Sequence, residues 1–106
     1  MIGKFVEYEG ALGMIDALHE TPMGNLWGFV WSTPDKWVGQ LVQNPEKLRV
    51  LDGEEAILAL ESAKRYFDLE VGSLERRIEM HYEIDNEQRL QELLAEAKRW
   101  RDALKK

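Results

Sequence analysis

Cysteine is absent from this sequence, which excludes disulfide bonds, thiolate catalysis and metal sites built on cysteine. Long apolar runs are absent as well, and no stretch approaches the roughly 20 apolar residues of a transmembrane helix. Lys4 is not followed by the apolar segment that a signal peptide would have. From these absences we expect no membrane association and a cytoplasmic location.

Residues that carry out catalysis are scarce. The two histidines are His19 and His81. His81 with Glu79 or Glu83 on a predicted strand face supplies two candidate ligands, and His19 adds a third only if the fold brings it there. A metal site needs more ligands converging on one point. No serine lies in a Gly-x-Ser-x-Gly motif. The sequence therefore predicts no metal, no cofactor and no enzymatic activity.

Positive charge is in the minority, with 14 basic and 20 acidic side chains and a formal net charge of −6. An acidic surface repels phosphate backbones, so we expect no nucleic-acid partner. The charge is uneven: residues 1–85 carry −8 and residues 86–106 carry +2. The basic side chains at the end of the chain suit the C-terminus of a helix.

The central feature is an aromatic segment over residues 24–43, which holds three of the four tryptophans. Two β-favouring runs flank Pro34-Asp35, a pair that suits the centre of a type I turn. We expect a hairpin in which Trp31 pairs with Trp37, so that one face carries Trp27, Phe29, Trp31 and Trp37. A slip of one residue would exchange the two faces.

The remaining segments follow from periodicity. Alternation predicts strands over residues 2–9 and 77–84, the second with a helix from Ser73 as the competing interpretation. Residues 48–51 are a candidate short strand. Helical spacing of Ala11, Met14, Ile15 and Leu18 predicts a short helix that ends before Pro22. Asp52 caps a predicted helix over residues 53–67. An amphipathic helix covers about residues 86–105.

These elements predict an α+β fold: one small domain, residues 1–106, with an antiparallel sheet of four to five strands around a central hairpin. We expect the helices to pack on one face of that sheet. The strand meander followed by Asp52-Gly-Glu-Glu-Ala56 resembles small α+β modules, among them the HicB-type antitoxins. We transfer no function from that resemblance.

Tryptophan and tyrosine are enriched at binding hot spots, so the aromatic face of the hairpin is the predicted interaction patch. The competing interpretation makes these side chains ordinary core. We predict a non-enzymatic protein-interaction module, such as a small acidic inhibitor of the antitoxin, immunity or phage-encoded antagonist type. Its partner is another protein or a second copy that docks through the C-terminal helix. The alternative is a nucleotide-like small ligand, held by tryptophan and a clamp of Arg76, Arg77 and His81.

Overall fold

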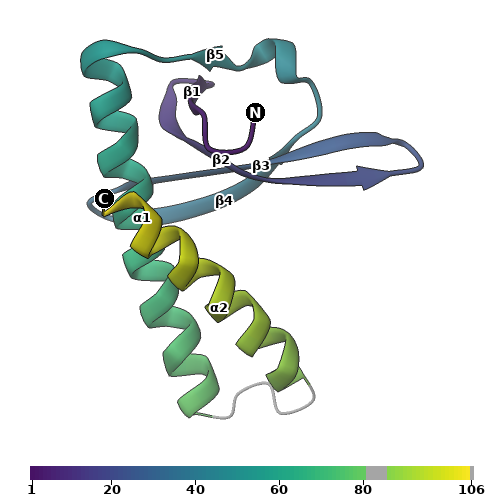
Figure 1. Cartoon of the computed structure of the whole chain (residues 1–106), viewed down its shortest axis with the longest axis vertical. Coiled ribbons are helices and arrows are strands. Elements are labelled where there is room, and N and C mark those ends of the chain that lie inside the picture. Colours follow the sequence, from purple (N-terminus) through teal and green to yellow (C-terminus); the bar gives the residue numbers. More distant parts are fainter. Residues whose placement is uncertain (81–85, 106) are drawn as a thin grey trace. The chain divides into compact units, whose positions relative to one another are not determined.

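The computed structural model describes residues 1–80 and 86–105, which form the predicted α+β fold (Figure 1). An antiparallel five-stranded sheet is followed by two helices. The chain divides into two compact units, Met1–Tyr66 and Phe67–Lys106. The first unit contains the sheet and the start of helix α1 (Gly53–Glu79), and the second contains the rest of α1 together with α2 (Glu87–Leu104).

The five strands are β1 (Phe5–Tyr8), β2 (Ala11–Thr21), β3 (Gly24–Thr33), β4 (Lys36–Val42) and β5 (Arg49–Val50). Their order in the sheet is β4-β3-β2-β1-β5. Consecutive strands form a meander, and a 3-10 turn, Pro45–Lys47, carries the chain back so that β5 pairs with β1. The strand predicted over residues 2–9 and the candidate strand over residues 48–51 are confirmed with shorter bounds.

The helix predicted from Ala11 to Leu18 is wrong, because this segment is β2. The cause is a bulge between Ile15 and Ala17, where the pairing with β3 shifts by one residue. A bulge inserts one extra residue and breaks the period of two. Ile15 and Leu18 consequently face the same side although they are three residues apart. That spacing imitates a helical stripe.

The register predicted for the central hairpin is also wrong by one residue. Thr33 pairs with Lys36, so that the loop is only Pro34-Asp35, and Trp37 pairs with Ser32 rather than with Trp31. Because side chains alternate along a strand, Trp31 and Trp37 lie on opposite faces of the sheet. The hairpin itself is confirmed, and it supplies strands β3 and β4 of the sheet.

Both faces of the sheet carry buried side chains, with Ile15 and Phe29 on one face and Met14 and Val30 on the other. One face carries a buried cluster, against which the half-buried Tyr8, Trp27 and Trp31 pack: Val6, Ile15, Phe29, Val42 and Leu48. Tyr8 meets Phe29 edge-on, with ring centroids 6.0 Å apart. The first turns of α1 cover the other face, where Ser62 meets Ser32 of β3.

Helix α1 spans Gly53–Glu79, twelve residues beyond the predicted end. The strand predicted over residues 77–84 is therefore wrong for residues 77–79, and residues 81–85 lie outside the described part of the chain. Phe67, Val71 and Leu74 are buried at 4-3 spacing, which continues the apolar stripe of a helix. The alternation that begins at Arg77 is thus the end of a helical pattern.

Helix α2 spans Glu87–Leu104 and begins after Asn86, close to the predicted bounds. Its buried side chains are Leu90, Leu94 and Ala97. The ring of Trp100 stacks on that of Phe67 with centroids 6.1 Å apart. Within the unit of residues 67–106, α2 runs back along the C-terminal part of α1 (Figure 1).

Candidate binding pocket beside Trp31

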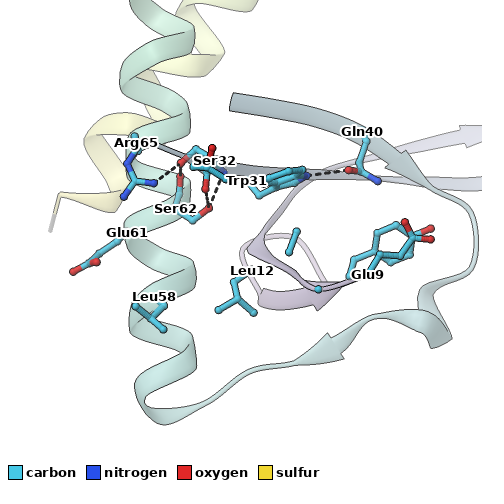
Figure 2. Close-up of a pocket in the computed structure, with 13 residues that line it drawn as sticks. Glu9, Leu12, Trp31, Ser32, Gln40, Leu58, Glu61, Ser62 and Arg65 are labelled. Carbon is cyan, nitrogen blue, oxygen red and sulfur yellow. Dashed lines mark hydrogen bonds between the residues drawn. The ribbon is translucent and has the colours of Figure 1, made fainter. Parts of the chain in front are cut away.

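The first unit contains a pocket of about 560 Å³ (Figure 2). Its walls come from three places that are distant in sequence: the β1–β2 turn, the end of β3 together with Gln40 of β4, and one face of α1. The pocket is lined by Tyr8, Glu9, Gly10, Ala11, Leu12, Trp31, Ser32, Thr33, Gln40, Leu58, Glu61, Ser62 and Arg65.

A buried polar contact fixes α1 to β3 at the base of this pocket. The Ser32 N–H donates to Ser62 Oγ at 2.8 Å, and Ser32 Oγ donates to the Ser62 carbonyl oxygen at 2.7 Å. Arg65 Nη1 in turn donates to Ser32 Oγ at 3.2 Å. Both serines are buried, so these bonds satisfy groups that water does not reach. The guanidinium of Arg65 is thereby held in one orientation at the pocket.

The indole of Trp31 forms the opposite wall and is held in place by two residues of β4. Its Nε1 donates to Gln40 Oε1 at 3.0 Å. Lys36 Nζ lies 5.1 Å from the centroid of the ring, within the range of a cation–π contact. The side chain is half-buried. It therefore offers a flat apolar surface whose orientation is fixed.

The mouth of the pocket combines one apolar side chain with charges of both signs. Leu58 is 54% exposed, and Glu61 and Arg65 follow on the same face of α1 (Figure 2). Glu9 lies across from them in the β1–β2 turn with a φ of 51°. Such turns favour glycine or asparagine at positive φ, and a glutamate there costs conformational energy.

The structure separates the members of the predicted aromatic patch. Of Trp27, Phe29, Trp31 and Trp37, only Trp31 lines the pocket. Phe29 is completely buried and belongs to the core cluster. Trp27 is half-buried beside that cluster, and Trp37 is 39% exposed on the opposite face of the sheet. The pairing of Trp31 with Trp37 that defined the patch is thus not formed.

The arginines of the predicted ligand clamp, Arg76 and Arg77, do not line this pocket. Arg76 and Arg77 lie in the last turn of α1 within the second unit, and His81 is outside the described residues. The arginine that shares a pocket with a tryptophan is Arg65. Leu58, Glu61 and Arg65 repeat at i, i+3 and i+7, which places them on one helix face. That spacing was visible in the sequence, but the strand that faces it was not.

Neither a metal centre nor a membrane span emerges over residues 1–80 and 86–105. Within those ranges no group of three or more histidine, aspartate or glutamate side chains gathers to hold an ion. Neither described helix has the length and apolar character needed to cross a bilayer. Comparisons of the chain with protein families, curated proteins and solved structures find no match.

Proposed function

We propose that this chain is a non-enzymatic protein-interaction module of the cytoplasm and that its partner inserts a segment into the pocket beside Trp31. The observation that carries the proposal is the pocket itself, where a fixed indole and an exposed leucine lie next to oriented polar groups. Interfaces commonly combine an apolar centre with a polar rim. Tryptophan and arginine are the residue types enriched among binding hot spots.

The rigidity of the pocket supports binding rather than a packing role alone. Trp31 is hydrogen-bonded to Gln40, and Arg65 is hydrogen-bonded to Ser32, so both side chains have already lost much of their rotamer freedom. A partner that meets fixed side chains loses less entropy on association. An acidic protein with such a site suits an inhibitor of the antitoxin, immunity or phage-encoded antagonist type.

The proposal can be tested by site-specific photo-crosslinking in the cells that make the protein. Leu58 and Ile57 are adjacent on α1 and almost equally exposed, at 54% and 57%, but only Leu58 lines the pocket. A photo-reactive residue at position 58 should capture one discrete protein partner, and the same residue at position 57 should capture much less. The added substitution Arg65→Ala should abolish the product at position 58. Equal labelling from both positions would contradict the proposal.

A small ligand is the second candidate, because Trp31 and Arg65 reach the same pocket. An indole face and a guanidinium together suit a planar anionic molecule such as a nucleotide. Native mass spectrometry of the protein taken directly from cells distinguishes the two functions. A small bound mass that disappears in Arg65→Ala favours the ligand, whereas a bound protein favours the interaction module.

A further inference from the structure

Strand β4 is one edge of the sheet, and among the described residues no strand pairs with its outer side. Alternate residues of an edge strand direct their N–H and C=O groups outward, where another strand can pair with them. Natural edges are commonly blocked by proline, by charge or by a bulge. Over its seven residues β4 has no proline and no acidic side chain, and its only charged residue is Lys36.

Two large apolar side chains are exposed on the α1-facing side of β4. Trp37 is 39% exposed and Leu41 is 56% exposed. Their pairing with Ser32 and Gly28 places both on the same face. They lie two residues before and two residues after Gly39, so the strand has the same kind of side chain at equal distances on either side of its centre.

We propose that β4 pairs antiparallel with β4 of a second copy of this chain about a two-fold axis at Gly39. In this register Trp37 of each copy lies opposite Leu41 of the other, and both apolar side chains are covered by one interface. Aromatic and aliphatic residues opposite one another stabilise antiparallel strands. A two-fold interface must be self-complementary, and the placement of these two residues around Gly39 meets that condition.

Charge favours a second copy meeting at this edge. Each chain carries a net charge of −6, so two copies repel one another over most approaches. Strand β4 holds none of the 20 acidic residues. In the proposed register Lys36 lies opposite Val42, and the two lysines are far from each other along the seam. This assembly goes beyond the proposed pocket function and does not depend on it.

Cysteine crosslinking tests the register directly, because the natural chain has no thiol. Two variants, Trp37→Cys and Leu41→Cys, are oxidised separately and as an equimolar mixture. Residues opposite one another across a strand pair are close enough for a disulfide. We expect the mixture to form a disulfide-linked dimer at least ten times faster than either variant alone, because equal positions lie about 13 Å apart along the seam.

Sedimentation of two double variants supplies a second, independent measurement. Trp37→Glu with Leu41→Lys sets opposite charges across the seam, and Trp37→Lys with Leu41→Lys sets like charges there. Both remove the same apolar side chains. We expect the first to dimerise at least ten times more tightly, although the second carries less net charge. Equal dissociation constants, equal crosslinking rates, or a wild-type chain that remains monomeric at millimolar concentration would each overturn the proposal.

Discussion

Ser32 and Ser62 satisfy each other's hydrogen-bonding groups across the contact between β3 and α1. The N–H and hydroxyl of Ser32 donate to the hydroxyl and carbonyl oxygens of Ser62, at 2.8 and 2.7 Å, and both residues are only 7% exposed. Ser62 lies between the alanines of α1 that are fully buried, Ala59 and Ala63. The small side chains let the helix approach the sheet until two serine side chains span the remaining distance.

Ser62→Ala should therefore destabilise the protein. The substitution leaves the buried N–H of Ser32 without its acceptor, which costs about 1–3 kcal/mol. Ser73→Ala is the matched control, because Ser73 is half-buried on the same helix and the change adds only helix propensity. Urea denaturation of the two variants gives the comparison. Equal midpoints would show that the contact contributes nothing to stability.

Gly13 is the position in the sheet that tolerates a side chain least. An added Cβ would meet the Val30 carbonyl oxygen at 2.1 Å and Trp31 Cβ at 2.9 Å. Gly13→Ala should cost more than about 2 kcal/mol, since backbone of a neighbouring strand must move. Gly72→Ala is the contrasting change: its Cβ enters open space on α1, and we expect a gain of about 0.5–1 kcal/mol. Thermal melts of both variants check the predicted loss of stability for Gly13→Ala and the predicted gain for Gly72→Ala. A Gly13→Ala variant as stable as the natural chain would contradict the close pairing of β2 with β3.

Arg49 joins β1 to α1 by contacting Glu7 and Glu55, each at 2.8 Å. Its hydrogen bonds hold the pKa of the Glu55 carboxyl below the ordinary value. The stabilisation is thus present above that ordinary pKa and is lost as the pH falls through the lowered one. Arg49→Gln should raise the pKa of Glu55 in an NMR titration. The melting temperature near neutral pH should change little, because the Arg49–Glu55 ion pair is exposed.

A second arginine variant serves as the control for that titration. Arg89→Gln removes the partner of Glu92 on α2, whose contact is 3.6 Å. It should leave the titration of Glu55 unchanged. If Arg49→Gln also leaves it unchanged, the ion pair seen at β5 does not form in solution.

The sequence predicted the fold class but misplaced two elements, and both errors have a local cause. Periodicity identifies a strand only while the period of two is unbroken, and the bulge after Ile15 breaks it. At Arg77 the error is the opposite one, a strand predicted where the chain is helical, because a short alternation of residue types is the end of a longer helical stripe. Residue types near the hairpin turn were interpreted correctly, but the register depends on which pair closes the loop. That pair is Thr33 and Lys36.

The pocket was harder to predict than the fold. Trp31 was a candidate because of its residue type, and Arg65 belongs to a visible helical spacing. Trp31 and Arg65 line the same pocket only because α1 contacts β3 through Ser32 and Ser62. Serines at positions 30 residues apart carry no sequence signal that they will pair. Long-range side-chain contacts of this kind are what single-sequence patterns leave open.

The prediction of one domain can be tested through α1, which continues from the first compact unit into the second. Leu90 on α2 is 2% exposed, so Leu90→Ala should cost about 2–5 kcal/mol through the cavity it leaves. Leu69→Ala, at a site 36% exposed, is the control and should cost far less.

The tryptophans report on the two units separately. Trp100 lies in the second unit, stacked on Phe67, whereas Trp27 lies in the first. Leu90→Ala is introduced into two variants in which either Trp27 or Trp100 is the single remaining tryptophan, and unfolding is followed by fluorescence. If the chain is a single cooperative domain, Leu90→Ala lowers the midpoint by a similar amount in both variants, each compared with the same variant that keeps Leu90, because a helix shared by the two units couples their unfolding. A shift seen by Trp100 alone would instead show that residues 1–66 fold independently of α2.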